Sequence, residues 1–418
     1  MTINRQTVPP GLVLAAILFL SAIFSFNFKA NSFPDELAHL GYVADVANQG
    51  FPDYRNGVVV GAKSKNYLQH PPLYYMLVGA EYRLIGGEPR PAVFLLRTTN
   101  WMFLAAFFAC IAACLREFDL GALDKVFAFL VVAGVPMVPA LGGALSNDPL
   151  SFMGCALFFW GLLRWHLERN FALDLMLIGG VVAALSKATS ASVIVCLALA
   201  YICLFWKETF LKLRQLSPAD MIKILAAIGL VGVFYASMYL TYGRLFPRSG
   251  NGPALNFSLR NPDAPRRDLL QMMYFFIAGN VDSLQRPYGH VRFADLGFRD
   301  NVLRYVLGAA MLCGLFGLYR NWNHDRRTAR LILSILLGTA FFFSVYFVNT
   351  YSRHLATGYP GGIQARYGFG LLPAFAFVAA LGYSRIGNRY VRGGLVGLAA
   401  VPFLALFYTA VTGDLPLR

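Results

Sequence analysis

Long apolar stretches recur along almost the whole sequence, and they constrain the fold more than any other feature. A helix needs roughly 20 mainly apolar residues to cross the hydrocarbon core of a bilayer. Such stretches lie at 11–28, 93–115, 125–146, 149–166, 172–189, 190–206, 221–243, 301–319, 331–350, 368–384 and 393–411. We therefore predict an all-α polytopic membrane protein with about eleven transmembrane helices, forming a single membrane domain over residues 1–418.

The composition supports this prediction. Hydrophobic residues make up 57% of the chain and charged residues only 14%, whereas soluble domains carry roughly 25% charged residues. The net charge of +15 does not indicate a nucleic-acid partner, because cytoplasmic loops of membrane proteins are rich in Lys and Arg and face anionic lipids. The first apolar stretch is long for a signal peptide, so we expect an uncleaved anchor.

Basic residues concentrate in alternate short loops, which predicts the topology. If the N-terminus is cytoplasmic, the basic loops are 116–124, 164–171, 207–220, 320–330 and 385–392. The positive-inside rule then places three other segments on the outer face, where they would form the catalytic face: residues 29–92, 244–300 and 351–367. Within the first of these, residues 73–86 are apolar but too short to span, which predicts a juxtamembrane helix on the outer surface.

Two acidic motifs border predicted spans. Asp35 and Glu36 follow the first span, and they suit either an ordinary helix start or a general base near the membrane surface. Asn147 and Asp148 stand before Pro149. That pattern is typical of a helix N-cap, and on the same face as Asp35 it could also contact a substrate hydroxyl or a cation.

The candidate phosphate-binding residues are cationic or aromatic: His70, Lys187, Arg353, His354, Gln364, Arg366 and Tyr367. Arg suits phosphate because its planar guanidinium donates two parallel hydrogen bonds. An Arg that reaches to the membrane interface beside a Tyr is the alternative explanation for Arg366 and Tyr367. His70 opens an HPPLYY segment. There it is an exposed turn residue, a hydrogen-bond donor to phosphate or a metal ligand.

Taken in order, these motifs resemble those of the GT-C superfamily of membrane glycosyltransferases, which includes protein O-mannosyltransferases and lipid A aminoarabinose transferases. The combination of PDExxH, HPPLYY, SNDPL and a late IQARY is more similar still to a bacterial branch of predicted membrane proteins. The resemblance covers roughly residues 1–200 and 363–373.

The resemblance implies an inverting glycosyltransferase that moves a sugar from a polyprenyl-phosphate donor to a glycan, lipid or protein acceptor of the cell envelope. It implies a multi-pass protein of the bacterial inner membrane with an outward-facing active site. Asp35 lies at the position of the catalytic carboxylate with Glu36 adjacent, Asp148 at the second acidic position, and His70 and Arg366 near the donor. Members differ in metal use, so a divalent metal stays open.

Two other functions fit a polytopic protein of this kind. A transporter or flippase of lipid-linked sugar would often show internal repeats, and the sequence shows none. A noncatalytic subunit with a GT-C-like fold is the third hypothesis. The acidic motifs at the predicted outer surface favour the enzyme, and the sugar, lipid length and acceptor stay open.

Overall fold

The computed structural model of the chain describes most of the sequence. The described residues are 8–30, 32–33, 35–51, 70–86, 89–243, 245, 266–284, 297–358 and 362–412. Every regular element among them is a helix, which confirms the predicted all-α class.

The elements of the first half are α1 (Val8–Asn27), α2 (Glu36–Gln49), α3 (Leu73–Ile85), α4 (Pro89–Leu96), α5 (Thr99–Arg116), α6 (Ala122–Ala133), α7 (Met137–Gly142), α8 (Asp148–His166), α9 (Ala172–Ser186) and α10 (Ala188–Leu204). The second half contains α11 (Trp206–Arg214), α12 (Pro218–Tyr242), α13 (Leu269–Leu284), α14 (Gly297–His324), α15 (Arg326–Thr357), the 3₁₀ helix η1 (Ala365–Leu371), α16 (Leu372–Ser384) and α17 (Arg389–Thr412).

Within the described residues, seven helical segments are long and apolar enough to cross a membrane. They lie in α1, α4–α5, α12, α14, α15, η1–α16 and α17, and an eighth span is formed if α10 and α11 count as one, although these two are bent by 99°. The other three predicted stretches are also helical: 125–146 is interrupted, 172–189 contains the short helix α9, and 149–166 is the continuous 19-residue helix α8, which is not among the spans found by length and hydropathy. The multi-pass class is therefore confirmed, with several helices that do not run straight through.

Two interruptions differ in how visible they are in the sequence. The predicted span 125–146 is two helices, α6 and α7, separated at Gly134–Pro136, because proline cannot donate the backbone hydrogen bond that would continue a helix. The break between α9 and α10 falls at Lys187, whose backbone is extended at φ −157° and ψ 128°. The break at Lys187 brings a charged side chain into the bundle, where it is 4% exposed.

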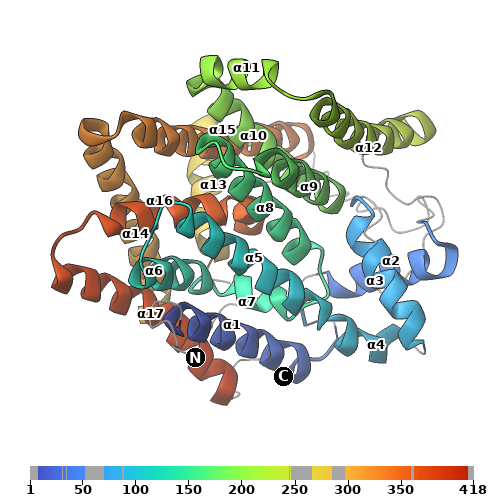
Figure 1. Cartoon of the computed structure of the whole chain (residues 1–418). Coiled ribbons are helices and arrows are strands. Elements are labelled where there is room, and N and C mark those ends of the chain that lie inside the picture. The colour runs from blue at the N-terminus through green and yellow to red at the C-terminus, as the bar shows by residue number, and fades with distance from the viewer. Residues whose placement is uncertain are drawn as a thin grey trace, which may run out of the picture.

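Helix α8 lies in the centre of the bundle, with α5 on one side and α9 and α10 on the other (Figure 1). Its close approach to α9 depends on glycines. A Cβ added to Gly154 would lie 2.7 Å from the backbone nitrogen of Ala183, and one added to Gly161 would lie 2.6 Å from that of Met176. Small residues of this kind let helix backbones approach closely in membranes.

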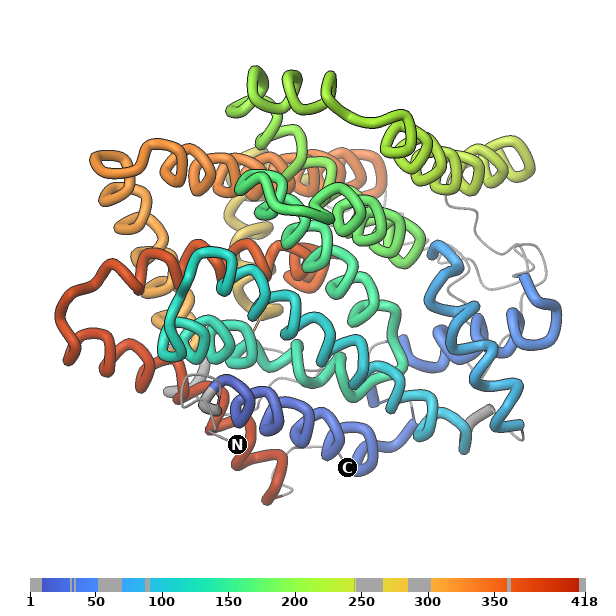
Figure 2. The backbone as a smooth tube through the Cα atoms, viewed as in Figure 1, coloured from blue at the N-terminus to red at the C-terminus, as the bar shows by residue number. Residues whose placement is uncertain are grey.

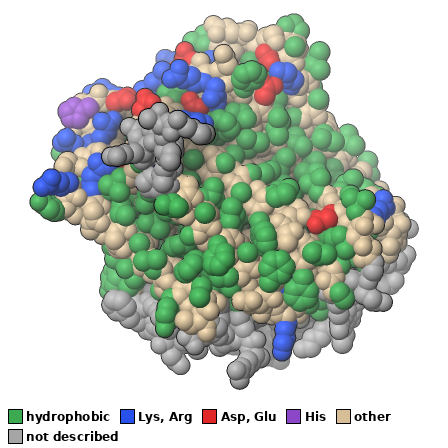
Figure 3. Space-filling model, turned by 60° about the horizontal axis from the view of Figure 1, so that its bottom comes forward, with side chains coloured by type: hydrophobic (Ala, Val, Ile, Leu, Met, Phe, Trp, Pro, Cys, Tyr) green, Lys and Arg blue, Asp and Glu red, His purple; other side chains and the backbone are tan. Residues whose placement is uncertain are grey.

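The remaining helices surround this centre. The tube in Figure 2 shows α1 and α17, from opposite ends of the chain, side by side, and their Phe19 and Phe407 rings have centroids 5.9 Å apart. Helix α12 packs on α9, and Met238 is its one buried residue. The face in Figure 3 is mainly apolar, with most of its charged side chains along the upper edge, as expected for a surface in contact with lipid.

A second, smaller apolar cluster lies beside the main core. It is formed by α2, α3 and α4 together with Leu145, Leu150 and Met238. Helix α3 corresponds to the helix predicted at 73–86, and its Tyr74, Tyr75 and Val78 are fully buried against α2. This cluster determines where the segment that carries Asp35 meets the start of α8.

Candidate active site

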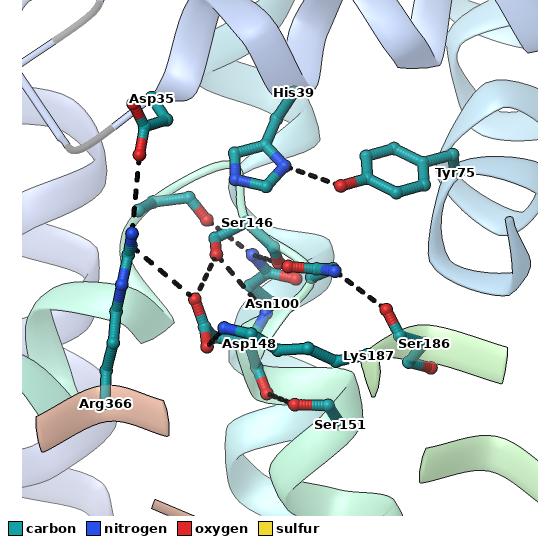
Figure 4. Close-up of polar contacts among 12 residues, drawn as sticks. Asp35, His39, Tyr75, Asn100, Ser146, Asp148, Ser151, Ser186, Lys187 and Arg366 are labelled. Carbon is teal, nitrogen blue, oxygen red and sulfur yellow. Dashed lines mark hydrogen bonds and ion pairs between the residues drawn. The ribbon is translucent and has the colours of Figure 1, made fainter. Parts of the chain in front are cut away.

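Four charged side chains from distant parts of the chain meet at one place (Figure 4). Asp35 precedes α2, Asp148 begins α8, Lys187 separates α9 from α10, and Arg366 lies in η1. Arg366 Nη2 lies 3.3 Å from Asp35 Oδ2, and its Nη1 lies 3.9 Å from Asp148 Oδ2. Lys187 Nζ forms an ion pair with Asp148 Oδ1. The cluster therefore alternates two cations with two carboxylates.

Burial separates one member of this cluster from the others. The side chains of Arg366, Asp148 and Lys187 are 7%, 1% and 5% exposed, whereas that of Asp35 is 25% exposed. Moving an ion from water into a protein interior costs roughly several kcal/mol, even after the protein relaxes around it. Pairing with an ion of opposite charge offsets part of that cost. Asp35 is thus the carboxylate at the open side of the cluster.

The backbone at Asp35 is unusual and directs its side chain away from the helix that follows. Asp35 has φ 62° and ψ 14°, in the left-handed region, and its carbonyl accepts hydrogen bonds from the N–H groups of Ala38 and His39 at 2.9 and 3.0 Å. Its carboxylate makes no capping hydrogen bond to α2. The structure therefore does not place Asp35 as an ordinary N-cap side chain, and its carboxylate faces Arg366 instead.

Glu36 lies in different surroundings although it is the next residue. Its side chain is 0% exposed and bonds Arg97 through both oxygens, at 2.7 Å from Nε and 2.7 Å from Nη2. The N–H of Leu145 also donates to Glu36 Oε1 at 3.1 Å. Glu36 therefore points into the protein, while Asp35 points to the cluster.

The second acidic motif is held by hydrogen bonds around Asp148. The Ser146 hydroxyl donates to Asp148 Oδ2 at 2.8 Å, and the Asn147 amide donates to the carbonyl of Ser186 at 2.7 Å. Asn100, from the first turn of α5, donates to the carbonyl of Ser146 at 3.0 Å. Asn147 thus joins the start of α8 to the end of α9, beside Lys187.

Aromatic and imidazole rings line the side of the cluster next to Asp35. The His39 ring is stacked on that of His70 at 6.1 Å, and His39 Nδ1 lies 2.8 Å from the Tyr75 hydroxyl. Burial lowers the pKa of His39 to about 4 and holds the pKa of His70 well below its usual value. Both imidazoles are therefore neutral at neutral pH, and they present polar atoms beside Asp35 without adding charge.

Comparison with solved structures identifies the fold. No family model matches the sequence, and no curated protein matches it. The crystal structure of ArnT from Cupriavidus metallidurans bound to undecaprenyl phosphate aligns with 94% of this chain at a TM-score of 0.57 and 14% identity. The apo structure of the same protein aligns with 94% of this chain at a TM-score of 0.52 and 16% identity.

The fold is that of ArnT. This confirms the GT-C-like bundle predicted from the motifs. The chain covers 63% and 62% of the two ArnT chains, so it spans less than two thirds of their length.

The predicted residues of the 351–367 segment fall into two groups in this ArnT-like bundle. Arg366 is in the cluster, and the Tyr367 ring lies 5.6 Å from Lys187 Nζ. His354 is buried, and its Nε2 accepts the backbone N–H of Arg267 at 2.9 Å. Gln364 donates its backbone N–H to the Tyr346 hydroxyl at 2.8 Å.

Arg353 belongs with His354. Its guanidinium lies beside Gly362, where an added Cβ would be 2.5 Å from Nη2. Arg353 and His354 thus contact flanking segments of the fold, whereas Arg366 and Tyr367 contact the charged cluster.

The sequence did not lead us to assign Arg97, His39 or Tyr75 to the site, although His39 and Tyr75 end its PDExxH and HPPLYY motifs. Arg97 had a visible signal, because it interrupts an apolar stretch that was assigned to a span and charged residues at membrane depth are functional candidates. The pairing of Tyr75 with His39 could not be seen in the sequence, because the two are 36 residues apart. Among the described residues, no group of three or more His, Cys, Asp or Glu side chains could hold a metal ion.

Proposed function

We propose that this protein is an inverting glycosyltransferase that moves a sugar from a polyprenyl-phosphate donor to a cell-envelope acceptor. The observation that carries the proposal is the pairing of a partly exposed carboxylate, Asp35, with a buried guanidinium, Arg366, in the fold of ArnT. One ArnT structure holds undecaprenyl phosphate, which supports a donor of the same chemical class here.

The proposed chemistry is a single displacement at the anomeric carbon. The acceptor oxygen forms a bond to that carbon while the bond from the carbon to the phosphate oxygen breaks, so the configuration inverts. The acceptor proton passes to the Asp35 carboxylate, which acts as general base. The phosphate leaves as an anion and needs no general acid, because Arg366 and Lys187 stabilise the growing charge.

The roles of the three carboxylates follow from their contacts. Asp148 is 1% exposed and paired with Lys187, and Glu36 is 0% exposed and paired with Arg97. Proton transfer requires a group that can reach the substrate hydroxyl, and Asp35 is the most exposed of the three. We therefore assign the role of general base to Asp35. Asp148 holds the two cations Arg366 and Lys187 in place.

Charge balance couples donor binding to the base. The two cations Arg366 and Lys187 are matched by two carboxylates, so a donor phosphate brings surplus negative charge. Phosphate and Asp35 compete for the Arg366 guanidinium, and a carboxylate released from a cation is a stronger base. Donor binding therefore prepares Asp35 to accept the acceptor proton.

The proposed location is the bacterial inner membrane with the cluster on the outer face. The support is the Lys/Arg asymmetry of the short loops. Segments 29–92 and 244–300 of the proposed catalytic face lie partly outside the described residues. Single-cysteine labelling from either side of the membrane, at Ala30 and at Arg320, tests this orientation, and equal labelling from the same side would contradict it.

The test of function is a transfer assay with the purified protein and a panel of undecaprenyl-phosphate sugars. Asp35→Asn keeps the shape of the side chain but removes the basic oxygen, so transfer is expected to fall roughly a hundredfold or more. Undecaprenyl phosphate should still bind, because Arg366 and Lys187 remain. Flipping of donor without any transfer, in vesicles holding the wild-type protein, would instead favour a flippase.

A further inference from the structure

One guanidinium joins the two segments that carry the acids of the cluster. Arg97 lies in the turn between α4 and α5, and its side chain is 0% exposed. Its Nε and Nη2 donate to the two carboxylate oxygens of Glu36, each at 2.7 Å. Glu36 is the residue directly after Asp35, the proposed base. The Arg97–Glu36 pair therefore fixes the first turn of α2 next to that base.

The remaining N–H groups of Arg97 hold the end of α1. Nη1 donates to the carbonyls of Ser25 at 2.6 Å and Phe28 at 2.8 Å, and Nη2 donates to the carbonyl of Lys29 at 3.1 Å. A guanidinium has five N–H donors, and these contacts together with the two to Glu36 use all of them. The segment that leads from α1 to Asp35 is therefore fixed at both of its ends.

The same pair reaches the second acidic segment. Glu36 Oε1 accepts the backbone N–H of Leu145 at 3.1 Å, and Leu145 precedes Ser146, Asn147 and Asp148. Asn100, one turn after Arg97, donates to the carbonyl of Ser146. Arg97 and Asn100, at the α4–α5 turn and the start of α5, thus bond both the backbone before Asp35 and the backbone before Asp148.

We propose that Arg97 is a positioning residue: acting through Glu36, it sets the placement of Asp35 and Asp148 on either side of Arg366. The proposal rests on the glycosyltransferase function for its catalytic meaning. Stability alone does not explain the arrangement, because a buried ion pair is often no more stabilising than apolar residues of similar volume. Directional hydrogen bonds do explain the arrangement. Arg97 bonds residues 25–29 and Glu36, and Glu36 bonds Leu145. Apolar packing could not fix the positions of these carbonyl and carboxylate groups.

The placement of Asp35 can be read without any substrate. In a protein with Asp35→Cys, a thiolate beside Arg366 would have a lowered pKa, because an opposite charge within about 4–6 Å favours the charged form. The rate of alkylation as a function of pH reports this pKa. The background is Cys203→Ser, because Cys203 is the exposed native cysteine and the other five are buried.

We expect the introduced thiol to titrate at least about one unit below the usual value of about 8.5. Adding Arg97→Met should return the pKa toward that value, because residue 35 would no longer be held opposite Arg366. Arg392→Met is the matched control. It removes a different guanidinium, which pairs with Asp124 through side chains 26% and 7% exposed. This pair lies in a different part of the bundle, so the thiol pKa should stay unchanged.

The outcomes separate this proposal from the proposed function. An unchanged thiol pKa in a folded Arg97→Met protein overturns the positioning role, whatever the transfer assay shows. If Arg97→Met does not accumulate, Glu36→Gln decides in its place, since it keeps the side-chain volume and loses the charge. In the transfer assay, Arg97→Lys should lower kcat more than it raises the donor KM. If the thiol pKa responds to Arg97 but the wild-type protein, with Asp35 in place, transfers no sugar, the glycosyltransferase function is overturned and the positioning role stands.

Discussion

The two ends of α8 carry charged clusters that use the same ion-pair chemistry in opposite surroundings. At the Asp148 end, the paired side chains are 1–25% exposed. Near the His166 end, Glu168 pairs with Lys212 and Arg327, and Glu208 pairs with Arg330, with side chains 21–64% exposed. An exposed pair contributes about 0–1 kcal/mol, whereas buried ions are held at a large desolvation cost. Burial, and not the number of ion pairs, therefore distinguishes the cluster at Asp148 from the cluster of Glu168 and Glu208.

The largest effect on stability should come from breaking the buried cluster. Asp148→Asn leaves Lys187 as a buried cation without its carboxylate, so we expect a loss of about 3–5 kcal/mol in the free energy of unfolding. Equilibrium unfolding in mixed detergent micelles measures it. A loss below about 1 kcal/mol would mean that this end of α8 behaves like the exposed end.

The next effect concerns the donor. Arg366→Ala should weaken binding of undecaprenyl phosphate by about 1.5–3 kcal/mol, which is typical of a hydrogen bond to a charged group. Arg330→Ala, at the other end of the bundle, is the control and should leave the affinity unchanged. Titration of the detergent-purified proteins with undecaprenyl phosphate distinguishes the two variants. Equal affinities would return Arg366 to the role of an interfacial side chain.

An effect that is smaller per pH unit should appear in the pH dependence of stability. The folded pKa of His39 is about 4 and its unfolded value is 6.5, so between these values the unfolded chain binds a proton that the folded chain does not. Stability should therefore fall as the pH drops from 6.5 toward 4, by at most about 1.4 kcal/mol per pH unit for one proton.

Substitution of His39 separates its contribution to the pH dependence of stability from the contributions of the other histidines. In His39→Gln the slope between pH 6.5 and pH 4 should be shallower than in the wild type, when both are measured by unfolding in the same micelles. An identical slope would show that the ring beside Asp35 is as accessible to protons as a surface histidine.

The smallest effect is expected at the exposed end of α8. Glu208→Gln removes the partner of Arg330 and should change the free energy of unfolding by about 0–1 kcal/mol. High salt should reduce the difference further, because ions screen exposed pairs. Like Asp148→Asn, this variant replaces a paired carboxylate with an amide. If both variants lost a similar free energy of unfolding, the distinction between the two clusters would be removed.

The sequence predicts the class of fold because hydropathy and helical length act locally. It also selects four of the residues that meet at the cluster, since Asp35, Asp148, Lys187 and Arg366 each interrupt or border an apolar stretch. It does not separate Asp35 from Glu36, because their difference lies in partners 331 and 61 residues away. The break at Lys187 is equally hidden, since no proline or glycine marks it, whereas Pro136 marks the break before α7.

The break at Lys187 has a consequence for the surrounding lipid. Helix α9 has 15 residues and α10 has 17, which rise about 22 and 25 Å, whereas the hydrocarbon core is about 30 Å thick. Either the bilayer thins around these two helices or the break at Lys187 lies below the level of the neighbouring headgroups. A lipid phosphate could then meet Lys187 while its chain stays within hydrocarbon, and bilayers of shorter acyl chains should suit the protein better.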